Sequence, residues 1–321
     1  MLAGITGRRW VFYGALGLMV ALLFVPGFHS EYLNLTFRNI LMFAAMSYGW
    51  NMIGGYTGYV SFGNVVFFGI GAYCSAVLST HGVDNLFADV ALAVVVNVIF
   101  AVLVGLPILR LRGHYFGIAT LALGLAAFDI ANNLDALGGS GGVGLKQADQ
   151  AHFSIYYYAM WAVTLACMLV TFFIARSKLG YAFVAIRENE EAAQVLGISP
   201  TRYKVIAWAI GAMMGGAAGA VFAPANGFLD PGTAFAIDNN VYPIAMAILG
   251  GMGTASGPLI GAVLLSGLNE ILQEHFLSIH ALFFGVVIVL MILFLPRGLM
   301  YLVGLRGGMR RWLGDLQAYR A

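Results

Sequence analysis

Apolar runs of about 20 residues recur along almost the whole chain and constrain its fold more than any other feature. A helix needs about 20 mostly apolar residues to cross roughly 30 Å of hydrocarbon, and a helix satisfies its own backbone polar groups in that layer. Only 9% of the residues are charged and 61% are hydrophobic, which excludes water as the main solvent of the chain. The sequence therefore predicts an all-α, polytopic integral membrane protein with a single transmembrane domain over residues 1–321.

About ten transmembrane helices are predicted. They fall at 10–28, 35–53, 63–80, 87–109, 115–134, 155–175, 205–226, 241–256, 258–274 and 281–296. Glycines and Pro258 interrupt the region 241–274, and one broken helix or a re-entrant segment is the alternative there. With that alternative the total falls to eight or nine.

Basic residues indicate the orientation of these spans, because Lys and Arg concentrate in cytoplasmic loops. With ten alternating spans and a cytoplasmic N-terminus, 14 of the 16 basic residues lie inside, and the C-terminus is cytoplasmic as well. The exceptions are Lys146, in an outer loop, and Arg38, whose long side chain is expected to reach the outer interface. A cleaved secretory signal is disfavoured, since no small-residue cleavage pattern follows the first apolar run.

One long charged segment, residues 177–204, interrupts the apolar pattern on the predicted cytoplasmic side. Its apolar residues follow helical spacing, and Gly197 can end the helix. The segment therefore predicts an amphipathic helix that docks a soluble partner. A helix that lies flat on the headgroups is the alternative, which the acids Glu188, Glu190 and Glu191 disfavour because the inner leaflet is anionic.

Two glycine-rich segments, 54–63 and 249–258, mix glycine with hydroxyl and amide side chains. Non-helical backbone at membrane depth persists only where it is buried in protein or lines a watery cavity, and interrupted segments in both halves of a transporter point to its translocation route. Tight packing with a cytoplasmic turn is the alternative. Gating is favoured over substrate binding, since 54–63 falls near the inner surface. The candidate pathway or gating residues are Tyr56, Thr57, Ser61, Asn64, Thr254 and Ser256.

The sequence carries no recognisable motif for catalysis. It has no G-x-x-x-x-G-K-[ST] phosphate loop, so the chain is not expected to hydrolyse ATP, and no cofactor or metal site is predicted. His275 and His280 are five positions apart, which does not place both rings on one helical face. The basic residues lie in short loops and form no broad surface for nucleic acid.

A stand-alone secondary transporter is the alternative from another functional class. Such a carrier would require an ionisable residue near the centre of a span, whereas Asp129 is expected near an outer end.

Several segments together resemble the LivM-like permease subunits of bacterial branched-chain amino acid ABC importers. They are GGYTGYVSFGNVVFFGIGAY (54–73), LRLRGHYFGIATLA (109–122), GGSGGVGL (138–145), the charged segment 177–204 and AILGGMGTASGPLIGA (247–262). The charged segment resembles the EAA-type loop of that family, with Glu191, Ala192 and Ala193 followed by Gly197. It departs from other importer permeases at residues 207–210, where those proteins have Ile-x-Leu-Pro.

The resemblance implies an ABC importer permease fold and a heteromeric complex in the bacterial cytoplasmic (inner) membrane. The other members would be a second, LivH-like permease, cytoplasmic ABC ATPase subunits that bind the ATP, and an extracytoplasmic substrate-binding protein. The loop docks on the ATPase in that family, and the residues thereby implied in coupling are Arg187, Glu188, Glu190, Glu191, Ala192, Ala193 and Gly197. The implied substrate is a branched-chain or other hydrophobic amino acid, although related permeases serve urea, short amides and organic or aromatic acids.

Overall fold

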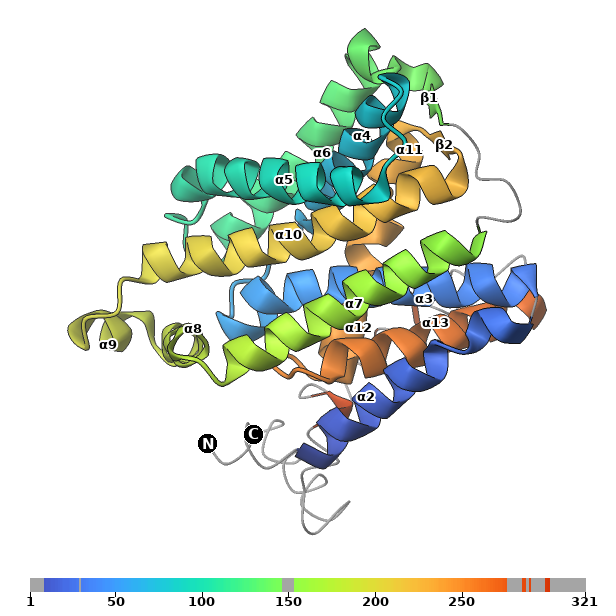
Figure 1. Ribbon diagram of the computed structural model, residues 1–321. Coiled ribbons are helices and arrows are strands. Elements are labelled where there is room, and N and C mark those ends of the chain that lie inside the picture. The colour runs from blue at the N-terminus through green and yellow to red at the C-terminus, as the bar shows by residue number, and fades with distance from the viewer. Residues whose placement is uncertain are drawn as a thin grey trace.

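The computed structural model describes residues 9–28, 30–145 and 153–275, together with 285, 286, 289 and 298–300. Within these residues the chain is almost entirely helical (Figure 1). The longer helices are α2 (Arg9–Leu22), α3 (Glu31–Trp50), α4 (Asn64–Thr80), α5 (Leu86–Ile108), α6 (His114–Asn133), α7 (Phe153–Ala175), α10 (Pro200–Asn226), α12 (Asp238–Gly250) and α13 (Gly257–His275).

Shorter elements connect these helices. They are η1 (Val25–Phe28), the π-helical turn η2 (Asn51–Tyr56), η3 (Asp135–Leu137), η4 (Gly139–Gly141), α8 (Lys178–Glu188), α9 (Glu190–Val195), α11 (Pro231–Ala234) and the strands β1 (Val143–Gly144) and β2 (Phe228–Leu229). The two strands form one antiparallel pair, with Val143 opposite Leu229.

Each longer helix falls on one of the first nine predicted spans. By length and composition, four of them are apolar enough to cross a membrane, namely α5, α6, α7 from Ser154 onward, and α10. The region 241–274 forms two helices, α12 and α13, joined by residues 251–256. Most of the predicted span 281–296 lies outside the described residues, as does Lys146, so the total of about ten spans stays a prediction.

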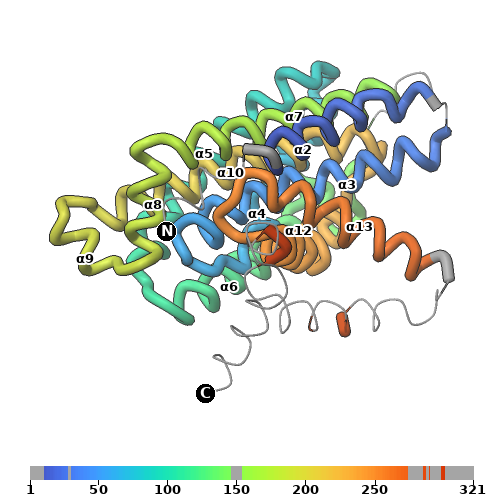
Figure 2. Tube along the Cα trace, turned by 90° about the horizontal axis from the view of Figure 1, so that it is seen from below, coloured from blue at the N-terminus to red at the C-terminus, as the bar shows by residue number. Residues whose placement is uncertain are grey.

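Helix α10 is the centre of the packing. In its span 78% of the residues are buried, against 22% for α5, and Figure 2 shows α10 with α3 and α4 between α7 on one side and α6 on the other. Glycine permits this close approach. A Cβ on Gly211 would lie 2.5 Å from the carbonyl oxygen of Gly49 on α3, and one on Gly219 would lie 2.0 Å from the carbonyl oxygen of Phe68 on α4.

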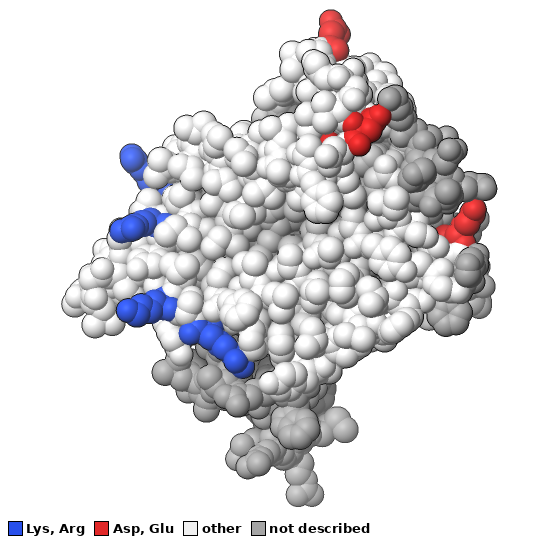
Figure 3. Space-filling model, in the orientation of Figure 1, with Lys and Arg blue, Asp and Glu red and all other residues white. Residues whose placement is uncertain are grey.

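Charged side chains gather at opposite ends of the helices (Figure 3). Lys and Arg side chains lie at the end that carries α8 and α9, and Asp and Glu side chains on the same face lie toward the other end. We call these the basic end and the acidic end. The chain alternates between them from α2 to α13 (Figure 1), the pattern expected of a protein whose basic loops share one side of a membrane.

Arg38 on α3 does not extend to the outer interface as expected. Its side chain is buried, with Nη1 donating to the carbonyl oxygen of Ala225 at 3.1 Å and Nη2 donating to Oδ1 of Asn226 at 2.9 Å. The last carbonyls of a helix carry partial negative charge, so the guanidinium stabilises the C-terminal end of α10. Arg38 thereby fastens α3 to α10, which explains why it can remain buried.

Candidate functional site

The charged segment 177–204 forms two short helices and not the single helix expected. Asn189 has extended backbone (φ −162°, ψ 111°) between α8 and α9, and its Oδ1 accepts a hydrogen bond from the Ala192 amide at 2.9 Å, which caps α9. Gly197 follows α9 with a positive φ of 82°, the conformation predicted for the residue that ends the helix, and Pro200 begins α10. The pair α8–α9 protrudes from the basic end (Figure 1).

The inner face of α8–α9 packs against the helical bundle. Phe183, Ile186 and Ala193 are each at most 3% exposed. A Cβ on Gly180 would lie 2.2 Å from the carbonyl oxygen of Ile174, so α8 begins in close contact with the end of α7. The pair is therefore fixed to the bundle and does not hang freely from it.

The tip of α9 exposes two apolar side chains. Val195 is 88% exposed and Leu196 is 77% exposed. Glu191 lies nearby, and its ion pair with Arg112 (3.8 Å) contributes little because both side chains are mostly in water. Neighbouring exposed apolar residues beside charges are typical of a surface that a partner covers. The sequence pattern did not single out Val195 or Leu196 as partner contacts, because apolar side chains on an amphipathic helix are expected to be buried.

Glu190, a predicted coupling residue, turns inward. Its carboxylate accepts a hydrogen bond from the Tyr59 hydroxyl, and its Oε1 lies 3.1 Å from Nζ of Lys204 on α10. Lys204 also donates to the Tyr59 hydroxyl at 3.1 Å, and its ammonium lies 4.2 Å from the centroid of the Tyr59 ring. We call these three residues the charged joint.

The charged joint is largely shielded from water. The side chains of Lys204 and Glu190 are 2% and 17% exposed. Burial alone raises the pKa of the Glu190 carboxyl, but hydrogen bonds from Tyr59 and Lys204, with the charge of Lys204, outweigh it and hold that pKa below its ordinary value. The carboxylate is therefore ionised near neutral pH, and removing one partner of such a pair costs about 3–5 kcal/mol.

Arg187 provides a second inward contact, from α8. Its Nη1 donates to the carbonyl oxygen of Gly55 in η2 at 2.9 Å, and a Cβ on Gly58 would lie 2.7 Å from its Cγ. Its Nη2 lies 3.3 Å from Oε1 of Glu188. The remaining predicted coupling residues divide into Glu188, Glu191, Ala192 and Gly197, which are exposed, and Ala193, which is buried.

The two glycine-rich segments, 54–63 and 249–258, meet at the basic end. Asn51, at the start of η2, joins them, since its Nδ2 donates to the carbonyl oxygen of Thr254 at 3.0 Å and its Oδ1 accepts from the Gly253 amide at 2.8 Å. Sequence analysis placed both segments among the gating candidates but did not identify Asn51, whose position inside an apolar helix is the signal that could have found it.

The six predicted pathway or gating residues are packed into this region. Thr254 is half-buried, and the buried members are Tyr56, Thr57, Ser61, Asn64 and Ser256. Thr57 Oγ1 donates to the Ile53 carbonyl at 2.7 Å, and Asn64 Nδ2 donates to the Met46 carbonyl at 3.1 Å. These contacts hold the backbone in place, and a role in gating stays a prediction for all six.

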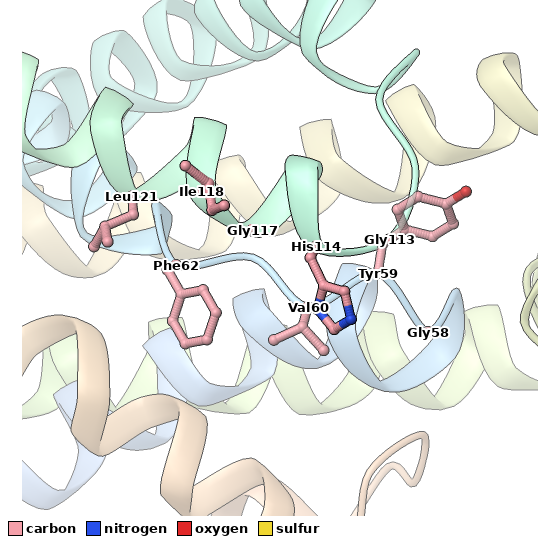
Figure 4. Close-up of a pocket in the computed structure, with 9 residues that line it drawn as sticks. All are labelled: Gly58, Tyr59, Val60, Phe62, Gly113, His114, Gly117, Ile118 and Leu121. Atoms are coloured by element: carbon pink, nitrogen blue, oxygen red, sulfur yellow. The ribbon is translucent and has the colours of Figure 1, made fainter.

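Between η2 and α4, residues 57–63 form neither helix nor strand, with Gly58 at a positive φ of 77°, and they border a hollow of about 740 Å³ (Figure 4). We call these residues the connecting segment 57–63. Ser61 is buried, and its carbonyl accepts from Trp50 Nε1 at 2.8 Å, whereas Val60 and Phe62 are 46% and 39% exposed and line the hollow. The other lining residues are Gly58, Tyr59, Gly113, His114, Gly117, Ile118 and Leu121.

The connecting segment 57–63 is held by side chains from neighbouring helices. The Phe62 amide donates to Thr120 Oγ1 on α6 at 3.0 Å, and the Phe62 carbonyl accepts from Asn240 Nδ2 on α12. These bonds satisfy backbone groups that a helix would satisfy internally. The volume of the hollow lies in the range of about 300–1,000 Å³ that is typical of small-molecule sites, and its apolar lining suits an apolar side chain.

The residues considered for the alternative functions are only partly described. Asp129 is exposed on the last turn of α6, away from the middle of that helix. The side chain of His275 and all of His280 lie outside the described residues.

Comparison with known proteins shows which protein family the chain matches. A family model described as the permease component of branched-chain amino acid transport systems matches residues 33–295. That range includes the charged joint, the connecting segment 57–63 and the tip of α9. No solved structure matches the chain.

Known relatives match over most of their lengths. The high-affinity branched-chain amino acid transport system permease protein LivM of Salmonella typhimurium is 30% identical over 292 residues, which cover 81% of this chain and 68% of the relative. The LivM protein of Escherichia coli K12 matches with the same identity and coverage. The permease protein LivH of Escherichia coli K12 is 29% identical over 259 residues, which cover 74% of this chain and 83% of the relative.

Proposed function

The chain belongs to the family of permease components of branched-chain amino acid transport systems, and from that premise we propose how it works within an ABC importer. It is an integral membrane protein and a transport subunit. The chain is similar to both LivM and LivH permeases, which supports a pair of related permeases. We assign the translocation path for branched-chain amino acids to this chain together with a LivH-like second permease.

The proposed complex lies in the bacterial inner membrane, with the basic end in the cytoplasm and the acidic end outside. The gathering of Lys and Arg at the basic end supports this orientation. With ten spans, both termini are cytoplasmic. An extracytoplasmic binding protein then delivers substrate to the acidic end, and ATP is bound and hydrolysed by separate cytoplasmic subunits.

The exposed tip of α9 is the observation that carries the coupling role. Val195 and Leu196 remain in water although the inner face of α8–α9 is packed against the bundle. Contact with an ATPase subunit would remove these apolar groups from water, which is favourable by roughly 25 cal/mol per Å² of buried apolar surface. Glu191 beside the tip adds an exposed charge that can pair with the same partner.

The hollow beside the connecting segment 57–63 is assigned to the substrate path. Val60, Phe62, Ile118 and Leu121 give it apolar walls. Such walls accommodate the aliphatic side chain of leucine, isoleucine or valine. The related permeases that serve urea or short amides would place a polar group in the same hollow, and these four apolar side chains disfavour such a group.

A variant at the tip tests the coupling role directly. The substitutions Leu196→Asp and Glu191→Lys should abolish co-purification of co-expressed ABC ATPase subunits with the detergent-solubilised permease, because each places an unfavourable charge in the docking surface. The yield and thermal stability of the isolated permease should stay unchanged, since both side chains are exposed.

The matched control is Phe87→Asp, which changes a residue as exposed as Val195 (88%) but located at the start of α5, toward the acidic end. This variant should retain the ATPase subunits. Full retention of the ATPase by both tip variants would contradict the proposed docking site.

A further inference from the structure

Two inward-facing side chains of α8–α9 form hydrogen bonds with η2 and with the segment that borders the hollow. Arg187 of α8 donates to the carbonyl oxygen of Gly55 in η2, and Glu190 of α9 accepts from the Tyr59 hydroxyl. Gly58 and Tyr59 themselves line the hollow. A single set of contacts therefore leads from the proposed docking helices to the wall of the proposed substrate path.

The charged joint makes the second of these contacts rigid. Tyr59, Glu190 and Lys204 each bond to both of the others. The two charges are almost out of water, where an ion left without its partner is strongly disfavoured. The three groups therefore stay together when one of the elements that carry them moves, and Glu190 cannot shift without displacing Tyr59.

The connecting segment 57–63 is the element that can move. Its backbone is held by separate side-chain bonds from α3, α6 and α12 and not by a helical ladder. Helix α10, which carries Lys204, is the most deeply buried of the four candidate spans in the described chain. A displacement of α9 therefore acts more readily on the segment than on α10.

We propose that Tyr59, Glu190 and Lys204 transmit movement of α8–α9 to the connecting segment 57–63, which closes or opens the hollow as the ATPase turns over. This inference rests on the proposed function, since it requires an ATPase that docks on α9. Glu190 receives the movement, Tyr59 delivers it to the segment, and Lys204 bonds to both and keeps them together. Glu190 and Lys204 are positioning residues, because they act through Tyr59 and do not touch the transported molecule.

The substitution Tyr59→Phe tests the link. It removes the hydroxyl that bonds Glu190 and Lys204 but keeps the ring, which packs against Phe116 with 5.5 Å between centroids. In the full complex, reconstituted in proteoliposomes with its binding protein, ATPase subunits should remain bound and hydrolyse ATP. Leucine uptake per ATP hydrolysed should fall by about tenfold or more.

The matched control is Tyr203→Phe. Tyr203 precedes Lys204 on α10, and its ring contacts Phe183 of α8 at 6.4 Å between centroids. This substitution also removes a tyrosine hydroxyl, but from the residue next to Lys204 and not from the charged joint. Uptake per ATP should therefore stay within about twofold of the unmodified complex. If Tyr59→Phe also retains its uptake per ATP, the proposed link is overturned.

A labelling experiment measures the movement itself. The chain carries Cys74 and Cys167, and with both replaced by alanine, Val60→Cys places a single thiol in the wall of the hollow. Its rate of reaction with a soluble maleimide should change severalfold between the nucleotide-free and the vanadate-trapped complex, and this change should disappear when Tyr59→Phe is added. An equal change in both backgrounds would contradict the link.

These outcomes separate the link from the function on which it rests. A complex that contains the unmodified permease and shows no ATP-dependent uptake would overturn the permease function and the link together. Normal uptake by that complex, combined with normal uptake per ATP by Tyr59→Phe, would overturn the link alone.

Discussion

At the scale of single residues, glycine decides how closely the helices of this permease approach. The stripe Gly211, Gly215 and Gly219 on α10 faces backbone atoms of α3 and α4. Gly211 and Gly219 have room for a hydrogen but not for a methyl group, whereas a Cβ on Gly215 would make ordinary contacts, the nearest at 3.4 Å from Cβ of Phe67. A substitution at Gly211 or Gly219 must displace a neighbouring backbone, which side-chain repacking cannot relieve.

The substitution Gly219→Ala should destabilise the protein. Its Cβ would lie 2.0 Å from the carbonyl oxygen of Phe68, and such overpacking costs about 1–3 kcal/mol. The thermal unfolding midpoint of the detergent-solubilised permease should fall by several degrees. Gly17→Ala on α2 is the control, because a Cβ there meets nothing within 4 Å, and an equal loss of stability in both variants would contradict the close-packing account.

Buried charge is the second feature at this scale, and it shows the limit of sequence reasoning. Arg38 and Lys204 both lie in helices. Each is bonded to a partner far away in the sequence, Arg38 to Ala225 and Lys204 to Tyr59, and Lys204 also pairs with Glu190 on α9. A single sequence indicates that a charge in a span needs a partner, but it does not indicate which partner. The inward role of Glu190 could therefore not be predicted from its place among three acids.

At the scale of elements, the helices could be predicted well and the breaks between them poorly. Long apolar runs specify helices because the bilayer leaves no other way to satisfy the backbone. The break at Asn189 depends on one extended residue and one side-chain cap, a local choice that helical spacing does not reveal. The alternation of apolar Val60 and Phe62 with Ser61 and Gly63 departs from helical spacing, and it was the available signal for the segment that borders the hollow.

The role of the connecting segment 57–63 can be tested through Phe62, which lines the hollow. Phe62→Asp would place a carboxylate among apolar walls, and leucine uptake should fall by about tenfold or more because the charge repels the substrate carboxylate and hydrates the apolar site. Binding of the ATPase subunits should be unaffected. The control Phe62→Leu keeps an apolar wall and should transport within about twofold of the unmodified permease.

Normal uptake by Phe62→Asp would show that substrate does not pass this wall. Loss of uptake in Phe62→Leu together with loss of ATPase binding would instead indicate that the segment has a structural role only. Leucine uptake and binding of the ATPase subunits are measured in the same proteoliposomes, with ATP hydrolysis as the internal reference.

At the scale of the whole molecule, charge distribution and family agree. The basic end carries α8–α9, the connecting segment 57–63 and the hollow, so the proposed docking surface and the proposed gate lie on one side of the membrane. Composition was sufficient to predict a membrane protein, and the family match identifies a permease component. The contact of residues 54–63 with 249–258 depends on tertiary packing and could not be derived from either segment by itself.

Uptake driven by ATP is the most direct measurement of the central claim, that this permease takes its energy from a docked ATPase. Radiolabelled leucine should enter proteoliposomes that contain the full complex only when ATP is present on the side of the basic end and the binding protein is on the other side. The complex with Leu196→Asp should show no uptake above background. Uptake by the permease alone, driven by an ion gradient without ATPase subunits or ATP, would contradict the account and identify a secondary transporter.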